Sequence, residues 1–345
     1  MKVIEVRNVH EALLRGMDLL HVDGLHSESR NGQVYVAKTP VTTVYRKPKE
    51  RVMFWEERDA NPFFHFMEGL WMLAGRKDLR FIEQYNSRMS DYSDDGKNLH
   101  GAYGSRWRKL WKIDQIDQII NQLKTNPEDR RCVLQMWHPD QDLGRLSNDV
   151  PCNTCVYFSI TNKNSLQMTV SNRSNDIIWG AYGANAVHMS MLQEYMAFSI
   201  GVKVGEYYQI SNNYHAYWDV YEPLLEKFLE KDYLDFYAQR GFIDTNPYTI
   251  ENISPYPMIN TDKTTWDIDL NNFIENILQD SLLLLCNGEH NFYEDSFFKE
   301  VAVPISNTWD LYKMGKREEA ITEIQKCVAT DWHKACWEWL IRRGN

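Results

Sequence analysis

The stretch "NDVPCNTCVYF", residues 148–158, places two cysteines three positions apart, after a proline and before an alternating run typical of a β-strand. A zinc site at Cys152 and Cys155 would need two more ligands, and the chain has no second C-x-x-C and no H-x₃-H pair. A redox pair normally opens a helix, whereas residues 156–160 favour a strand. Two interpretations stay open: buried structural thiols, or a nucleophile presented at the start of a strand.

The composition limits the class of protein around this segment. The chain has 345 residues, 43% of them hydrophobic, which is ample for a large core. Its 38 basic and 48 acidic residues give a net charge of −10, which argues against a nucleic-acid or anionic-membrane surface. Scattered cysteines and a charged amino terminus favour a reducing, cytoplasmic location. The most apolar run, residues 282–286, is too short to span a membrane.

Hydrophobic periodicity outlines the elements. We expect a short strand and a helix within residues 1–20, helices over 63–75, 113–127 and 184–201, and strands over 131–137, 155–161 and 165–172. Residues 245–266 are rich in Pro, Asn and Thr, and strongly helical stretches follow. We therefore place a boundary between a catalytic domain, 1–245, and a mainly helical extension, 246–345. The large apolar residues of the extension are expected to serve packing: Trp309, Trp332, Trp337 and Leu340.

A second segment strengthens the nucleophile interpretation of Cys152. "SNRSNDIIWGAYGANAVHMSMLQ", residues 171–193, combines Arg173, Ser174 and Asp176 with Asn185 at the start of a helix. A guanidinium and a hydroxyl suit a phosphate, and an amide suits the edge of a base. Together these groups predict a nucleotide site.

These segments resemble those of the thymidylate synthase family, which includes the phage deoxynucleotide hydroxymethylases. The resemblance covers roughly residues 5–220 and rests on motifs in the family's order: "ESRNG" (28–32), "FMEGLWMLAG" (66–75), "AYGSRWR" (102–108), "EDRRCVLQMW" (128–137), "PCNT" (151–154), "NRSNDIIWG" (172–180) and "NNYHAYWD" (212–219). It implies an α+β fold in which helices pack on a large mixed sheet that also forms a homodimer interface.

The resemblance also implies a role for each matching residue. Cys152 would add to C6 of the pyrimidine, Glu68 would order water and move protons, and Tyr103 would support this network. Asp176 is expected near the pterin of the folate, and Trp71 beside the folate. The nucleotide would be held through its phosphate and its sugar, by Arg30, Arg173, Ser174, His215 and Tyr217, with Arg130 and Arg131 reaching across from the other subunit.

The reaction that the resemblance implies uses 5,10-methylenetetrahydrofolate as co-substrate and no metal. Thiolate addition at C6 makes C5 nucleophilic, and one-carbon transfer then leaves an exocyclic methylene on the base. Hydride from the folate converts this group to methyl and gives dTMP. Water converts it to hydroxymethyl.

Asn185 informs the choice of base. An amide can accept from N3–H and donate to O4 of uracil, whereas a carboxylate suits cytosine, so we expect dUMP. "GAYGAN" is one residue longer than the family's spacing; a strict count would select Ala184, but the helix pattern favours Asn185.

Four departures from the family pattern favour water over hydride. Asn153 replaces the histidine after the nucleophile, and Gly183-Ala184 replaces a Pro-Phe. Residues 86–96, "NSRMSDYSDDG", lack an expected tryptophan, and "WEWLIRRGN" does not resemble the family's apolar tail. Since exclusion of water protects the methylene intermediate, a wetter site favours hydration. We therefore expect a dUMP hydroxymethylase; the alternatives are a thymidylate synthase, a dCMP hydroxymethylase, or a nucleotide-binding protein without turnover.

Overall fold

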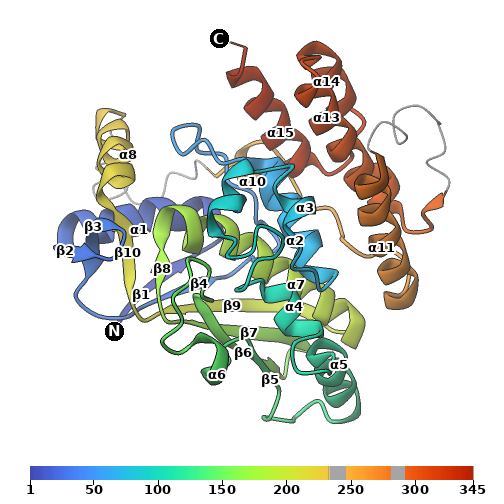
Figure 1. The fold of residues 1–345 in the computed structure, drawn as a ribbon, viewed down its shortest axis with the longest axis horizontal. Coiled ribbons are helices and arrows are strands. Elements are labelled where there is room, and N and C mark those ends of the chain that lie inside the picture. Colours follow the sequence, from blue (N-terminus) through green and yellow to red (C-terminus); the bar gives the residue numbers. More distant parts are fainter. Residues whose placement is uncertain (232, 234–245, 281–291, 345) are drawn as a thin grey trace.

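The computed structural model describes residues 1–231, 233, 246–280 and 292–344 (Figure 1). The run 282–286 and the expected boundary at residue 245 lie outside these residues. The strands are β1 (Lys2–Val6), β2 (Gly24–Ser29), β3 (Gly32–Ala37), β4 (Val41–Tyr45), β5 (Val133–Gln135), β6 (Asn153–Ile160), β7 (Ser165–Asn172), β8 (Asn175–Asp176), β9 (Lys203–Ser211) and β10 (Tyr214–Tyr217). The helices are α1 (Val9–Asp23), α2 (Pro62–Leu73), α3 (Leu79–Ile82), η1 (Ser87–Tyr92), α4 (Tyr103–Arg108), α5 (Gln115–Thr125), α6 (Pro139–Asp142), η2 (Ile177–Ala184), α7 (Asn185–Ile200), α8 (Trp218–Glu230), α10 (Pro247–Ile250), α11 (Lys263–Asp280), η4 (Phe298–Ala302), α13 (Val303–Lys313), α14 (Arg317–Ile324) and α15 (Thr330–Arg342).

Two mixed sheets form the framework. The larger has the strand order β1-β4-β9-β7-β6-β5, with β1 parallel to β4, β7 parallel to β9 and the other pairs antiparallel. The smaller has the order β2-β3-β10-β8. Helices pack on these sheets, so the expectation of an α+β fold with a large mixed sheet is confirmed.

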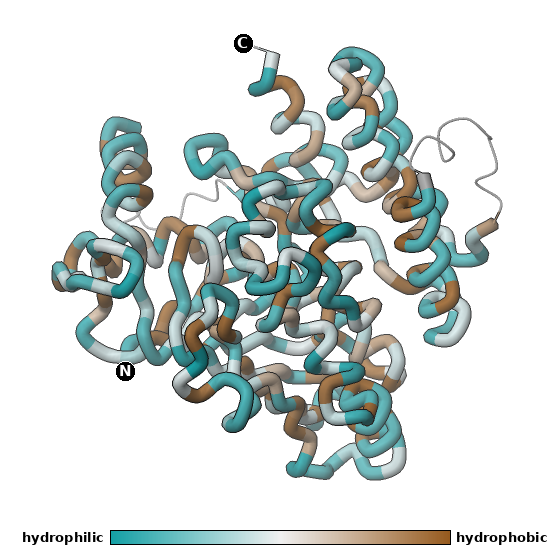
Figure 2. Tube along the Cα trace, viewed as in Figure 1, coloured by the Kyte–Doolittle hydropathy of each residue, from teal (hydrophilic) through white to brown (hydrophobic). Residues whose placement is uncertain are grey.

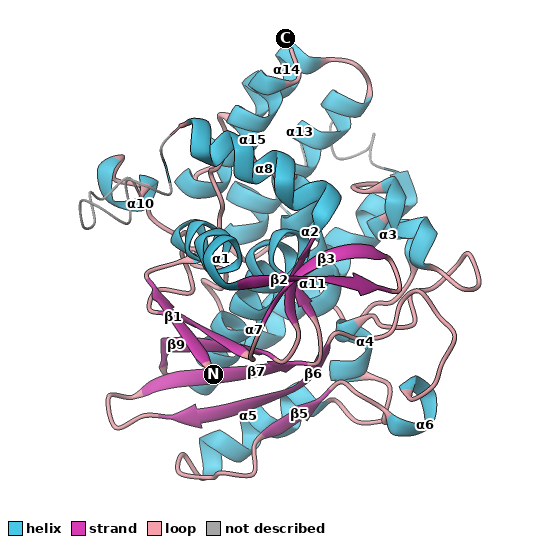
Figure 3. Cartoon of the chain, turned by 90° about the vertical axis from the view of Figure 1, so that its left-hand side faces the viewer, coloured by secondary structure: helices cyan, strands magenta, loops and turns pink. Residues whose placement is uncertain are grey.

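The central helix α7 is buried on nearly all sides. It packs against β7, β9 and α2, and Figure 3 shows α7 and α2 above the large sheet. Its buried residues include polar ones, such as His188 and Gln193, as well as apolar ones. It ends at Gly201, whose φ of 91° lies in the left-handed region that glycine adopts without strain.

Close packing around α2 depends on glycine. A Cβ at Gly69 would collide with the side chain of Met191 on α7, and a Cβ at Gly104 would collide with the backbone of Met72. The two glycines therefore allow α7 and α4 to approach α2 directly. Both lie within the quoted segments 66–75 and 102–108.

The C-terminal helices pack on the outer side of α2 (Figure 1). Phe63 contacts Trp309 and Trp339, with ring centroids 5.2 and 5.5 Å away, and Phe66 contacts Trp332 at 5.1 Å. Hydrophobic and hydrophilic segments alternate along α11 and α13 in Figure 2, as expected for helices that bury one face.

One hydrophobic cluster therefore runs through both parts of the chain, and the division at residue 245 stays a prediction. The packing role expected for Trp309, Trp332 and Leu340 agrees with their burial at 8%, 6% and 0% exposure. For Trp337 the expectation was wrong: its side chain is 38% exposed, because it lies on the outer face of α15. Within the described ranges, no helix is both long and apolar enough to cross a bilayer.

Candidate active site

A cavity of about 570 Å³ opens between the amino end of β6 and the small sheet. It brings together six residues that the sequence singled out for nucleotide chemistry: Arg30, Cys152, Arg173, Ser174, His215 and Tyr217. These residues come from the β2–β3 turn, the start of β6, the end of β7 and from β10. Segments that are far apart in the sequence therefore line one cavity.

Cys152 immediately precedes β6, whose pairing with β7 is irregular between Asn153 and Cys155. Bulges of this kind redirect side chains next to functional sites. The guanidinium of Arg173 lies beside the thiol, with Nη2 3.9 Å from Sγ. Arg173 is held by donating to the carbonyls of Pro151 and Val150, at 2.8 and 2.9 Å. The cation is therefore fixed by the loop that carries the cysteine.

Two opposing effects act on the thiol. Burial raises the pKa of Cys152 above its ordinary value, while the positive charge of Arg173, and more weakly that of Arg30, lowers it. Tyr103 lies on the same side, because its hydroxyl accepts a hydrogen bond of 3.3 Å from the backbone N–H of Asn153. Burial raises the pKa of Tyr103, so its hydroxyl keeps its proton.

The far wall of the cavity carries groups suited to a sugar and a phosphate. Arg30 follows β2 in an exposed turn and donates to the Ser147 carbonyl at 3.5 Å. His215 and Tyr217 alternate along β10, with their rings edge to face and centroids 5.4 Å apart. The Tyr217 hydroxyl accepts from Asn31 at 3.4 Å. Two arginine side chains, several hydroxyl groups and the imidazole of His215 therefore line the same cavity.

Asn185 lies at the centre of a buried chain of amides. Its Oδ1 accepts from Asn153 at 3.1 Å and its Nδ2 donates to Asn175 at 3.0 Å. Each amide nitrogen has two hydrogens and each oxygen two lone pairs, so Asn185 retains one donor and one acceptor position. Such a residue can still present both functions to the edge of a base.

The extra residue in "GAYGAN" is accommodated by a kink at Tyr182 and Gly183, where the backbone leaves helical geometry between η2 and α7. Helix α7 begins at Asn185. Asn185, rather than Ala184, therefore supplies the amide that reaches the neighbour of Cys152.

Asp176 belongs to β8 and pairs with His215 in the small sheet. Its Oδ1 accepts from the backbone N–H groups of Ile178 and Trp179, at 2.9 and 2.5 Å, while its Oδ2 is buried without a partner among the described residues. Burial raises the pKa of Asp176. Next to it, the guanidinium of Arg58 lies 4.4 Å from the ring centre of Trp179, which is 47% exposed.

Glu68 and Trp71 both belong to α2 but have different surroundings. Glu68 is buried, and its Oε2 lies 2.6 Å from Nε2 of His188 on α7. Trp71 is 1% exposed and donates to the Asp78 carbonyl at 3.1 Å. Trp71 therefore offers no surface to a folate in this structure.

The paired arginines are exposed and do not line the cavity of their own chain. Arg130 is exposed, and the Arg131 side chain is 81% exposed and bonds to Asp129 at 2.6 Å. Neither belongs to the lining of the Cys152 cavity. Their position beside β5 leaves them available to another molecule.

The structure adds residues that the sequence did not identify. Asn148, Asn213 and Tyr92 also line the cavity. Arg58, His65 and His188 are buried polar residues near Asp176 or Glu68. The spacing of His188 three residues after Asn185 was a usable signal, because residues three apart share one helix face. Arg58 lies in an irregular segment that no periodicity marks.

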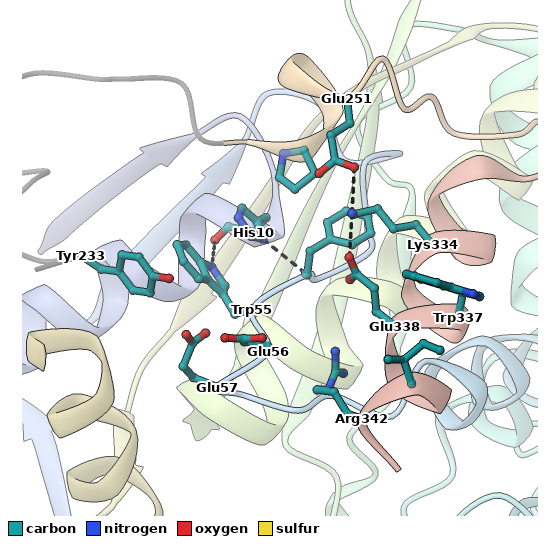
Figure 4. Close-up of a pocket in the computed structure, with 13 residues that line it drawn as sticks. His10, Trp55, Glu56, Glu57, Tyr233, Glu251, Lys334, Trp337, Glu338 and Arg342 are labelled. Carbon is teal, nitrogen blue, oxygen red and sulfur yellow. Dashed lines mark hydrogen bonds and ion pairs between the residues drawn. The ribbon is translucent and has the colours of Figure 1, made fainter. Parts of the chain in front are cut away.

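A second cavity, of about 500 Å³, lies where α15 meets residues 54–57 (Figure 4). Lys334 bridges Glu251 and Glu338 there, at 2.8 and 2.6 Å. It shares no lining residue with the Cys152 cavity. The thiol and the predicted nucleotide groups therefore define the candidate active site.

Comparison of the sequence with known proteins gives matches to one family. The family model described as thymidylate synthase matches residues 19–241. The chain is 45% identical over 347 aligned positions to the deoxyuridylate hydroxymethyltransferase of Pseudomonas phage M6, covering 99% of this chain and 95% of that protein. It is 34% identical to the protein of the same name from Bacillus phage SP01, covering 62% of this chain and 60% of that protein. The counterpart from Delftia phage PhiW-14 is 28% identical, with 62% of each chain covered.

Proposed function

Since the chain belongs to the thymidylate synthase family, we propose that it converts dUMP, 5,10-methylenetetrahydrofolate and water to 5-hydroxymethyl-dUMP and tetrahydrofolate. The observation that carries the proposal is Cys152 beside Arg173 in a cavity whose lining includes guanidinium, hydroxyl and imidazole groups suited to a phosphate and a sugar. The 45% identity to a deoxyuridylate hydroxymethyltransferase over nearly the whole chain supports the choice of product.

In the proposed reaction Cys152 adds to C6 of the uracil ring. Its thiolate is the reactive form, and the charge of Arg173 favours it. Arg173, Arg30 and Ser174 hold the phosphate, and His215 and Tyr217 hold the sugar. Binding of the phosphate and the sugar places C6 of the ring next to the thiol. The addition then proceeds within one complex and does not depend on a further encounter.

The folate is a co-substrate that supplies the one-carbon unit. Asp176 suits a pterin, because its buried Oδ2 has no hydrogen-bond partner of good geometry among the described residues and can accept from a ring nitrogen. The exposed ring of Trp179, with Arg58 over it, offers an adjacent flat surface.

Asn185 is the proposed reader of the base. Its remaining donor and acceptor match O4 and N3–H of uracil. Cytosine presents an amino group and an unprotonated N3 instead, so neither function of Asn185 would be paired in the orientation that Asn153 and Asn175 hold. Tyr103 and Glu68 are proposed to handle protons near the C4 carbonyl.

A homodimer is part of the proposal. Val133 and Tyr157 pair directly across β5 and β6 and are 42% and 48% exposed, so the outer face of the large sheet carries large apolar side chains. Burying this face against a second copy would bring Arg130 and Arg131 toward the partner's phosphate site. A two-fold interface uses the same patch on both subunits.

Mass analysis of the product tests the function. From dUMP and methylenetetrahydrofolate we expect the hydroxymethyl nucleotide with tetrahydrofolate. A methyl product with dihydrofolate would instead identify a thymidylate synthase, the candidate that family membership alone favours. Turnover of dCMP in preference to dUMP would identify a cytidylate enzyme.

A second experiment separates a catalyst from a nucleotide-binding protein. A catalyst forms a covalent ternary adduct with 5-fluoro-dUMP and methylenetetrahydrofolate, because fluorine cannot leave C5 as a proton does. We expect this adduct, attached at Cys152, in denaturing mass spectrometry. Reversible binding without an adduct would support the non-catalytic alternative.

A further inference from the structure

Glu68 and His188 form a buried contact between the two central helices. Oε2 of Glu68 on α2 lies 2.6 Å from Nε2 of His188 on α7, and the two side chains are 8% and 2% exposed. Burying an acid and an imidazole in the middle of a core costs stability unless they are paired or have a task.

The contact leaves hydrogen-bonding capacity unused. Among the described residues, three atoms of the pair have no hydrogen-bond partner of good geometry. They are Oε2 of Glu68 and both ring nitrogens of His188. Nearly all buried polar groups in folded proteins have such a partner, in the protein or in an ordered water. A small polar molecule bound at Nδ1 of His188 would satisfy the ring nitrogen that is not in contact with Glu68.

The pair lies next to the base-reading residue. His188 follows Asn185 by three positions on α7, so the two share one face of that helix, and Asn185 bonds to Asn153 beside Cys152. On α2, His65 precedes Glu68 by the same spacing. Burial, with the nearby charge of Arg58, lowers the pKa of His65 to about 3, so His65 is neutral.

The kink between η2 and α7 brings polar groups close to Gly183. A Cβ at Gly183 would lie 3.0 Å from the Ile178 carbonyl, 3.5 Å from Arg58 Nη2 and 3.8 Å from His65 Nε2. Without a side chain there, this side of the site is lined by polar groups instead of the aromatic wall described above as missing. A polar lining suits an incoming water.

We propose that His188, paired with Glu68, is the general base that activates the water that adds to the exocyclic methylene. This inference rests on the proposed function. It assigns to this chain a catalytic residue for the step that distinguishes a hydroxymethyl from a methyl product.

The step balances without an oxidant or reductant. The water oxygen forms a bond to the methylene carbon, and the π electrons of the C5–methylene bond move into the enolate of C5 and the C4 carbonyl. A water proton passes to the free nitrogen of His188, and the carboxylate of Glu68 stabilises the resulting imidazolium. Collapse of the enolate restores the C5–C6 double bond and expels the Cys152 thiolate, which recovers a proton from the imidazolium through solvent.

The variant His188→Gln tests the assignment, because glutamine keeps polar reach toward Glu68 but cannot take a proton. The assay is a single turnover of C5-tritiated dUMP, with 2-mercaptoethanol present to capture unreacted methylene intermediate as a thioether. We expect tritium release close to that of the unmodified enzyme, hydroxymethyl formation slower by about 100-fold, and a matching rise in thioether.

Ser190→Ala is the matched control. Ser190 is buried on the same helix but bonds back to the Val187 carbonyl at 2.9 Å, so its loss should leave both readouts unchanged. Equilibrium dUMP binding reports whether each variant folds, and His188→Asn replaces His188→Gln if the latter does not.

The role of His188 would be overturned if tritium release and hydroxymethyl formation stayed equal in the variant. This holds whether both are unchanged or both fall. Failure of the proposed function appears elsewhere, in the unmodified enzyme. If that enzyme yields a methyl product or none, both proposals are overturned together.

Discussion

Nη2 of Arg173 lies 3.9 Å from Sγ of Cys152, and Nη2 and Nε of the same guanidinium donate to the carbonyls of Val150 and Pro151, the two residues before the cysteine. The charge that favours the thiolate is thus built into the loop that carries the thiol. Burial acts in the opposite direction, as do the negative charges of Asp149 and Asp176, and together they leave the pKa of the thiol above its ordinary value.

Arg173→Gln should make Cys152 less reactive. Burial already raises the pKa of the thiol, and removing the adjacent charge raises it further, so less thiolate is present at any pH below the midpoint. Iodoacetamide alkylation, followed by mass spectrometry of the Cys152 peptide, should slow, and its pH midpoint should move up. Arg46→Gln, at an exposed arginine paired with Glu5, is the control. An unchanged midpoint in Arg173→Gln would remove this arginine from thiol activation.

Asn185→Asp should shift base preference from dUMP toward dCMP. A carboxylate cannot donate to O4 of uracil but can accept from the amino group of cytosine, and an unpaired buried group costs roughly 1–3 kcal/mol. The ratio of kcat/KM for the two nucleotides measures the change. Asn185→Ala, which removes both functions, should weaken both substrates without reversing the preference. A ratio that does not move in Asn185→Asp would show that another residue reads the base.

Two inactive variants should restore activity when their subunits are mixed. If Arg130 and Arg131 serve the partner's site, a hybrid of Cys152→Ala with the double variant Arg130→Ala/Arg131→Ala carries both defects in one site and leaves the other intact. Random reassociation should recover about a quarter of full activity. The control is each variant dissociated and reassociated alone. A mixture that stays inactive would mean that the arginines act within their own subunit.

Trp339→Ala should destabilise the whole chain, because Trp339 is 5% exposed and packs on Phe63 of α2. Replacing a buried Trp by Ala typically costs 3–5 kcal/mol. Trp337→Ala is a matched control on the same helix, since Trp337 is 38% exposed, and should change the unfolding free energy by less than about 1 kcal/mol. Urea denaturation measures both. Equal effects would contradict the observed packing.

Asp331 should make stability pH-dependent. Burial raises the pKa of its carboxyl to about 6, above its ordinary value of 3.8. The folded state then binds the proton more tightly than the unfolded state, so this group favours folding at low pH and its contribution is lost as pH rises from about 4 to 6. Relative to Asp331→Asn, the unfolding free energy should fall by up to about 3 kcal/mol over that interval. A difference that is constant with pH would place the carboxyl in a more polar environment.

The sequence predicted much of this site because its chemistry is local. Cys152 and Arg173 are close since β6 and β7 are neighbours along the chain, and the strand pattern around both was clear. The sequence was less informative where helix faces decide the outcome. Trp71 proved buried and Trp337 exposed, since periodicity does not show which other helices cover α2 and α15. The role proposed for His188 depends on its contact with Glu68 on a facing helix, and the sequence does not show that contact.

The packing of Phe63 and Phe66 beneath the C-terminal helices has an evolutionary consequence. In a homologue that ends soon after the region matched by the family model, these two aromatic rings would face water. Such a shorter protein should carry polar side chains at the equivalent positions, or cover them with an unrelated segment. Loss or gain of the helical tail and the character of these two positions should therefore change together across the lineage.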